Sequence, residues 1–166
     1  MPALEQKNRQ VANLYWLAFL LTGARDESAD LAVEAVDSPE NNAFFSSWML
    51  AWSRRVVISK ALSAIRQELA ASAKRIALAR SPRCAPSLPR SWSLSPAAGK
   101  LELERALLAI DAFPRCALLL MLFEGLSLDD ATVLLDVDRD LVRKAQIFAL
   151  EELTRNLAAT REAAHA

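Results

Sequence analysis

Basic side chains alternate with tryptophans in the middle of this 166-residue sequence. Trp48 and Trp52 introduce a run of cations at short intervals, namely Arg54, Arg55, Lys60, Arg66, Lys74 and Arg75. Aromatic rings stack on nucleobases while cations follow the phosphate backbone, and proteins hold single-stranded nucleic acid by this combination. The pattern therefore predicts a nucleic-acid surface. The alternative is a solvated basic face on a helix whose tryptophans are buried.

Charge is segregated along the chain, although the formal net charge is zero. Residues 1–52 carry 3 basic and 7 acidic side chains, residues 53–99 carry 9 and 1, and residues 100–166 carry 8 and 12. Because nucleic acid attracts the most positive part of a protein, the middle segment is the expected electrostatic footprint.

Residues that could support catalysis or bind a metal are sparse. The single histidine, His165, and the two cysteines, Cys84 and Cys116, lie far apart in the sequence, which argues against a zinc site or a Cys–His pair. The acidic pairs in the C-terminal third have the positions of cap and surface residues, and no Gly-rich phosphate loop is present. We therefore expect a protein that is not an enzyme and that has no metal, cofactor or small-molecule substrate.

The composition favours an all-α fold in the cytoplasm. Hydrophobic residues make up 53% of the chain, glycine occurs only three times, and hairpin signals are absent, whereas good helix formers dominate. No apolar run reaches the roughly 18 residues of a membrane span, and the N-terminus lacks the order of a signal peptide. Both thiols are expected to be reduced, which fits a cytoplasmic location.

Apolar periodicity predicts the helices that must position the basic and aromatic side chains. We expect helices over residues 3–21, 26–36, 43–79, 100–113, 114–124 and 128–135, and from residue 139 onward. Residues 81–99 contain four prolines and five serines, a composition typical of a linker. The sequence thus predicts two small helical domains, residues 1–80 and 100–166, joined by a Pro/Ser-rich linker.

Two short breaks divide residues 117–153 into three helical segments. Gly125 can adopt the left-handed conformation that ends a helix. Ser127 can cap the second segment, with Asp130 three residues later, and Asp138 can cap the third. Because breaks this short favour sharp turns between helices, the stretch predicts a compact helix-turn-helix.

Two blocks of residues carry a family resemblance. The C-terminal block contains Glu124-Gly125-Leu126-Ser127, Asp129-Asp130, Leu134-Leu135, Val137, Val142-Arg143, Ala149-Leu150-Glu151 and Leu153. The N-terminal block contains Leu14-Tyr15-Trp16-Leu17-Ala18, Leu21-Thr22-Gly23, Asp30-Leu31, Glu34, Phe45, Trp48, Arg54 and Ile58. These blocks resemble regions four and two, respectively, of the extracytoplasmic-function sigma factors of bacterial RNA polymerase.

The resemblance implies a sigma-factor-like protein that initiates or regulates transcription, with RNA polymerase core and promoter DNA as partners. It implies that the tryptophans and cations of the middle segment, as far as Arg66, contact the promoter. It also implies that Asp30 and Glu34 contribute to partner binding.

The outer face of the third helix-turn-helix segment is poor in positive charge. Arg139, Arg143 and Lys144 remain as DNA contacts. Helical phasing places Ile147 and Phe148 outward, where apolar anchors would suit a protein partner. A different rotation of the helix would instead bury Phe148 in the core.

Three functional hypotheses follow. The first is a sigma factor that contacts promoter DNA mainly through the middle segment. The second is a degenerate sigma mimic that binds an anti-sigma factor or another regulator without initiating transcription, motivated by a short connection between residues 36 and 44 and by the acidic C-terminal segment. The third, weaker hypothesis is self-association through Ile147 and Phe148.

Overall fold

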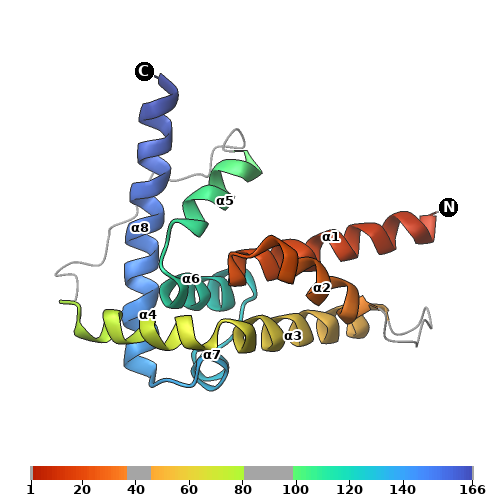
Figure 1. Ribbon diagram of the computed structural model, residues 1–166, viewed down its shortest axis with the longest axis horizontal. Helices are drawn as coiled ribbons and strands as arrows, with labels where there is room; N and C mark the ends of the chain where they lie inside the picture. The colour runs from red at the N-terminus through yellow and green to blue at the C-terminus, as the bar shows by residue number, and fades with distance from the viewer. Residues whose placement is uncertain (1, 37–45, 81–98, 166) are drawn as a thin grey trace. The chain divides into compact units, whose positions relative to one another are not determined.

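The computed structural model describes residues 2–36, 46–80 and 99–165 (Figure 1). Every regular element in these ranges is helical, which confirms the predicted all-α fold for them. None of the described helices is both long and apolar enough to span a membrane. The elements are α1 (Pro2–Thr22), α2 (Arg25–Val36), α3 (Ser46–Ala64), α4 (Arg66–Leu78), α5 (Lys100–Leu108), α6 (Ala112–Leu118), the π-helical turn η2 (Leu119–Phe123), α7 (Leu128–Leu135) and α8 (Arg139–His165).

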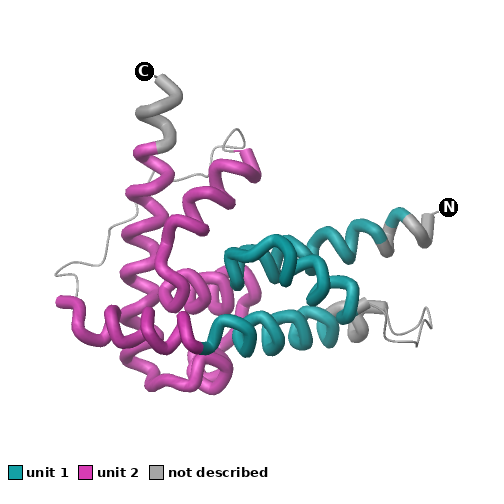
Figure 2. Tube along the Cα trace, in the orientation of Figure 1, with its two compact units in different colours: residues 1–66 teal, residues 67–166 magenta. Residues whose placement is uncertain are grey.

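The helices form two compact units, residues 1–66 and 67–166 (Figure 2). The first unit contains α1, α2 and α3, and the second contains α4 through α8. This boundary falls after Arg66, the first residue of α4, whereas the sequence predicts an N-terminal domain that extends to residue 80. The family-based domain ranges stay a prediction, and most of the predicted linker lies outside the described residues.

The first unit is a bundle in which each of its three helices packs against the other two. Leu14 and Leu21 of α1 are fully buried, as are Ala32 of α2 and Val57 and Ala61 of α3. The spacing of these residues gives each helix one apolar stripe, and burial of that stripe drives the bundle together.

The predicted helix over residues 43–79 is divided at Ile65 in its described part. The Ile65 amide still donates to the carbonyl of Ala61 at 3.2 Å, but a new helix begins at the next residue. Packing explains the break, because α3 buries its apolar stripe in the first unit while Ser72 of α4 bonds a residue of the second unit. Periodicity continues across Ile65, so it could not reveal the break.

The second unit is built around α6, whose seven residues are all buried. Phe113 is the largest of its fully buried side chains, and α6 packs against α8. Along α8, Val142, Ala145 and Ala149 are fully buried, as the helical phasing predicts. The long α8 is thereby fixed in its rotation about its own axis.

The helix-turn-helix caps are confirmed. The Ser127 hydroxyl accepts from the amide of Asp130 at 3.1 Å, and Asp138 Oδ1 accepts from the amide of Leu141 at 2.8 Å. Gly125 has a φ of 66°, the left-handed conformation that glycine adopts without strain. These contacts satisfy amides that have no partner inside a helix.

The segment before this motif differs from the predicted helix over residues 114–124. Helix α6 begins earlier, at Ala112, because the Asp111 side chain caps it, so Pro114 lies inside its first turn. The end is also different, since the Glu124 amide reaches back to the carbonyl of Leu119 at 3.0 Å and forms a π-helical turn. No local residue preference signals that turn.

Candidate functional site

The predicted nucleic-acid residues of the first unit lie on α3, except Arg66, which is the first residue of α4. Trp52 is 51% exposed and Arg55 is exposed, and their spacing of three residues puts both on one side of the helix. Arg54 is half-buried and Arg66 is exposed. The side chain of Trp48 lies outside the described residues. We call Trp52 and Arg55 the α3 face, because they combine a stacking ring with a solvated cation.

Lys60 and Glu34 are brought together, although the sequence assigns them to different partners. The ammonium of Lys60 on α3 forms an ion pair with the carboxylate of Glu34 on α2. Asp30 is exposed one turn earlier on α2. The pair neutralises one of the cations of α3, so fewer positive charges remain available to a polyanion than the sequence suggests.

The helix-turn-helix carries a concentrated negative charge. Its five aspartates between residues 129 and 140 are all exposed: Asp129, Asp130, Asp136, Asp138 and Asp140. We call these five residues the acidic surface. In a helix-turn-helix protein the first turn of the recognition helix meets the DNA, and here that turn would bring carboxylates toward phosphates.

Two of the three cations that the sequence assigns to DNA contact in this unit are already engaged. Arg139 Nη2 lies 2.5 Å from Asp129 Oδ1, so the first residue of α8 is paired with the first turn of α7. Arg143 is exposed. The Lys144 ammonium donates to the carbonyls of Ala77 at 3.0 Å and Ala79 at 2.6 Å.

The Lys144 side chain caps the C-terminal end of α4. The last carbonyls of a helix have no partner inside it and carry partial negative charge, so a lysine side chain is a suitable donor. The partners are separated by 67 and 65 positions in the sequence. The sequence predicts a DNA contact for Lys144, because no local signal reveals a bond over that distance.

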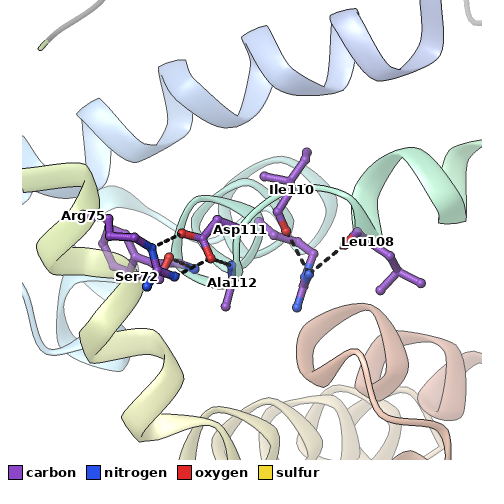
Figure 3. Close-up of polar contacts among 8 residues, drawn as sticks. Ser72, Arg75, Leu108, Ile110, Asp111 and Ala112 are labelled. Atoms are coloured by element: carbon purple, nitrogen blue, oxygen red, sulfur yellow. Dashed lines mark hydrogen bonds and ion pairs between the residues drawn. The ribbon is translucent and has the colours of Figure 1, made fainter. Parts of the chain in front are cut away.

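A polar cluster joins α4 to the N-terminal end of α6 (Figure 3). Arg75 Nε donates to Asp111 Oδ2 at 2.9 Å, and Arg75 Nη2 donates to Asp111 Oδ1 at 2.7 Å. Asp111 Oδ1 also accepts from the amide of Ala112 at 3.0 Å, and the hydroxyl of Ser72 accepts from the amide of Phe113 at 3.0 Å. The hydrogen bond from Arg75 holds the pKa of Asp111 below its usual value.

Of the residues in this cluster, only Arg75 belongs to the basic run that predicts a nucleic-acid surface. Asp111 and Ser72 were missed, although Asp111 just before an apolar segment is a typical helix cap. Nearby, the buried Arg115 donates from Nη1 to the carbonyls of Leu108 at 3.3 Å and Ile110 at 2.9 Å. Arg115 thereby fixes the end of α5 next to the start of α6.

The predicted apolar anchors on α8 are half-buried, and α7 carries two exposed aliphatic side chains. Ile147 and Phe148 are both half-buried on α8. On α7, Val133 is 79% exposed and Leu134 is 37% exposed. Val133 lies four residues after Asp129, and Leu134 lies four after Asp130, so the aliphatic and acidic side chains share one side of α7. A helical-wheel projection of α7 would predict that Val133 and Leu134 are exposed, since only Leu128, Ala131 and Leu135 fit an inward-facing stripe.

Reactive and metal-binding groups are few in the part of the chain that the structure describes. No three His, Cys, Asp or Glu side chains come together there in a way that could hold a metal ion. Cys116 is fully buried, and burial raises the pKa of its thiol to about 12, which suppresses the reactive thiolate. Burial also raises the pKa of Glu152.

The chain matches no protein-family model, no curated protein and no solved structure. Its function is therefore inferred from its own residues. Two surfaces matter most for that inference, the α3 face in the first unit and the acidic surface in the second.

Proposed function

We propose that this chain is a sigma-factor-like regulatory protein whose helix-turn-helix unit binds a protein partner and does not read promoter DNA. The motifs that resemble sigma regions two and four motivate the first half of this proposal. The acidic surface, with its five exposed aspartates, carries the second half.

Electrostatics decides between the two uses of the helix-turn-helix. DNA affinity comes largely from cations that displace counterions from phosphates. In this unit Arg139 is paired with Asp129, and Lys144 donates to two carbonyl oxygens. With the Arg139–Asp129 pair set aside, the exposed cation Arg143 faces the four other exposed carboxylates of the acidic surface. That balance disfavours close approach of duplex DNA.

The partner that fits this surface has basic side chains around a small apolar centre. Val133 and Leu134 offer aliphatic contact on α7, and Asp129 and Asp130 lie one turn before them. Protein interfaces commonly combine apolar anchors with a charged rim that sets specificity. An anti-sigma factor or another regulator with a basic amphipathic helix has the required chemistry.

The test compares transcription with protein binding. The purified protein is mixed with RNA polymerase core and assayed for promoter-dependent run-off transcription, and its affinity for anti-sigma factors of the same organism is measured by calorimetry. We expect no run-off product and a complex with one such factor. Promoter-dependent transcript together with sequence-specific duplex binding would refute the proposal.

A pair of variants locates the interface. Val133→Arg introduces a cation into the proposed contact and should weaken partner binding at least about tenfold, because it opposes the basic rim of the partner. Leu101→Arg changes an exposed leucine of the same unit, on α5, and should leave binding unchanged. Equal effects of the two substitutions would place the interface elsewhere.

A second function is favoured by the α3 face. Trp52 and Arg55 together offer the stacking and charge that single-stranded DNA requires. The protein would then contact promoter DNA through its first unit while its second unit binds protein. Salt-sensitive binding of a fluorescent single-stranded oligonucleotide to the full-length chain would support this function, and salt-independent or absent binding would exclude it.

A further inference from the structure

Helix α4 is held on the second unit by a small set of contacts. Its buried face consists of Leu69, Ser72, Ala73 and Ile76, of which two side chains are small. Ser72 and Arg75 bond the start of α6, and the last carbonyls of α4 bond Lys144 of α8. Figure 1 shows α4 running past the first turns of α8. The apolar part of this buried face is limited to Leu69, Ala73 and Ile76.

The ion pair that holds α4 to the start of α6 lies at the surface. The side chain of Arg75 is 58% exposed and that of Asp111 is 34% exposed, and exposed ion pairs contribute little to stability. The chain leaves α4 through residues 81–99, which contain four prolines and five serines. Elements with few buried apolar contacts are the first to open in native proteins. Helix α4 therefore has the properties of an element that can detach while α6 and α8 remain folded.

Detachment would change the charge that α8 presents. The carbonyl oxygens of Ala77 and Ala79 hold the Lys144 ammonium in the way that phosphate oxygens would. A polyanion and the end of α4 therefore compete for the same cation. Release of α4 would also free the guanidinium of Arg75, so the region would gain two available positive charges.

We infer that α4 is an intramolecular latch that masks Lys144 on α8, so that this cation becomes available for non-specific contact with a polyanion only when α4 is displaced. The latch consists of Ser72, Arg75 and the C-terminal carbonyls of α4, and it closes on Asp111, Phe113 and Lys144. This inference goes beyond the proposed protein interface, because it concerns α8 and not the exposed side of α7.

The experiment uses the full-length protein with Ser72→Ala and Arg75→Ala combined, which removes two contacts without adding bulk. Lys74→Ala is the matched control, since it removes an exposed cation from the same helix. Amide hydrogen exchange is measured along α4, α6 and α8. Affinity for a duplex DNA probe is measured at low salt by fluorescence anisotropy, with Lys144→Ala added to each variant.

If α4 is a latch, the double variant should lose amide protection in α4 alone and should bind duplex DNA more tightly. In the double variant, protection of the α4 amides falls at least about tenfold while α6 and α8 stay protected. Duplex affinity rises about threefold although a cation has been removed, and the rise disappears when Lys144→Ala is added. The Lys74→Ala control keeps its α4 protection and binds DNA slightly more weakly.

Three results would overturn the latch. Unchanged protection of α4 would show that the removed contacts do not hold it. Loss of protection in α6 and α8 together with α4 would make α4 an integral part of the core. A duplex affinity that falls as in the Lys74→Ala control would show that Lys144 is not masked.

Discussion

Helices α3 and α8 were both expected to contact nucleic acid, and they present their cations in opposite ways. On α3, Arg55 is exposed beside the half-exposed ring of Trp52. On α8, Arg139 is paired with Asp129, and Lys144 donates to backbone carbonyls. A similar set of basic residues thus gives an available positive surface in one unit and a largely neutralised one in the other.

The difference between α3 and α8 teaches that availability, and not the number of charges, decides what a basic segment can bind. A cation that already has an oxygen partner must lose that contact before it can bind a phosphate. The same holds within α3, where Lys60 is paired with Glu34 while Arg55 is solvated. Each of the following changes tests this distinction by making a cation available or by removing one.

The largest effect is expected from neutralising the acidic surface. Asp136 ends α7 in the left-handed conformation, with a φ of 55°, and Asp138 caps α8. Changing the five aspartates to asparagine keeps both caps, because asparagine suits both positions. At about 0.5 kcal/mol for each exposed charge, duplex DNA affinity at low salt should rise roughly seventyfold. Fluorescence anisotropy with a duplex probe measures the change.

The matched control for that variant removes acidic charge from the other unit. Asp26→Asn, Glu27→Gln and Asp30→Asn neutralise exposed side chains of α2. If the control raises duplex affinity as much as the five-residue variant does, net charge and not the acidic surface limits DNA binding, and the contrast between the units fails.

The next effect concerns the aromatic half of the α3 face. Trp52→Ala should lower affinity for a single-stranded oligonucleotide about tenfold, since stacking of one base contributes about 1 to 3 kcal/mol. Trp52→Phe should retain most of the affinity. Anisotropy titrations measure both, and thermal unfolding checks the fold. If Trp52→Ala kept full affinity for the oligonucleotide, the basic residues of α3 would form only a solvated helix face and no nucleic-acid site.

A smaller effect separates the free cation of α3 from the paired one. Arg55→Ala should weaken single-stranded binding about threefold and lower the salt dependence by about 0.7, the value for one phosphate contact. Lys60→Ala should weaken it less than about twofold, because Glu34 already neutralises Lys60. A larger loss in Lys60→Ala than in Arg55→Ala would contradict the ranking by availability.

The smallest effect is a pH dependence of stability in the second unit. The pKa of Asp111 is lowered mainly by its hydrogen bond from Arg75, so its ionised form stabilises the fold above the unfolded pKa of about 3.9. That contribution is lost as the pH falls through the lowered folded pKa. The free energy of unfolding, measured with urea, should therefore fall by less than about 1 kcal/mol on acidification. In Asp111→Asn this dependence on pH should be smaller.

Glu152 responds to pH with the opposite sign. Burial raises its pKa in the folded state, so its ionised form opposes folding and its protonation favours it. Glu152→Gln should consequently stabilise the second unit slightly at neutral pH. A destabilised Glu152→Gln variant would show that the ionised carboxylate makes a contact that outweighs its burial.

Much of the fold could be predicted because it depends on local chemistry. The caps at Ser127 and Asp138 and the left-handed Gly125 follow from side chains that bond the backbone within three residues. Buried Val142 and Ala145 follow from the helical repeat. These features require no knowledge of distant parts of the chain.

The contacts that define the candidate site could not be predicted, because they join distant segments. Arg75 and Asp111 are 36 positions apart, and Lys144 is more distant still from the carbonyls that it bonds. Nothing near Lys144 distinguishes a helix cap from a phosphate contact, since the same donor suits both. The helix break at Ile65 could not be predicted for the same reason, because packing against distant segments, and not local helix propensity, ends α3.

The alkylation rate of the buried Cys116 thiol can report how often the second unit opens. Alkylating reagents attack the thiolate, and with a pKa of about 12 the closed protein contains almost none of it at neutral pH. The side chain is also fully shielded from reagent. In a Cys84→Ser variant, the rate at which this remaining thiol is alkylated would therefore report how often the core around α6 becomes accessible, with no spectroscopic label attached to the protein.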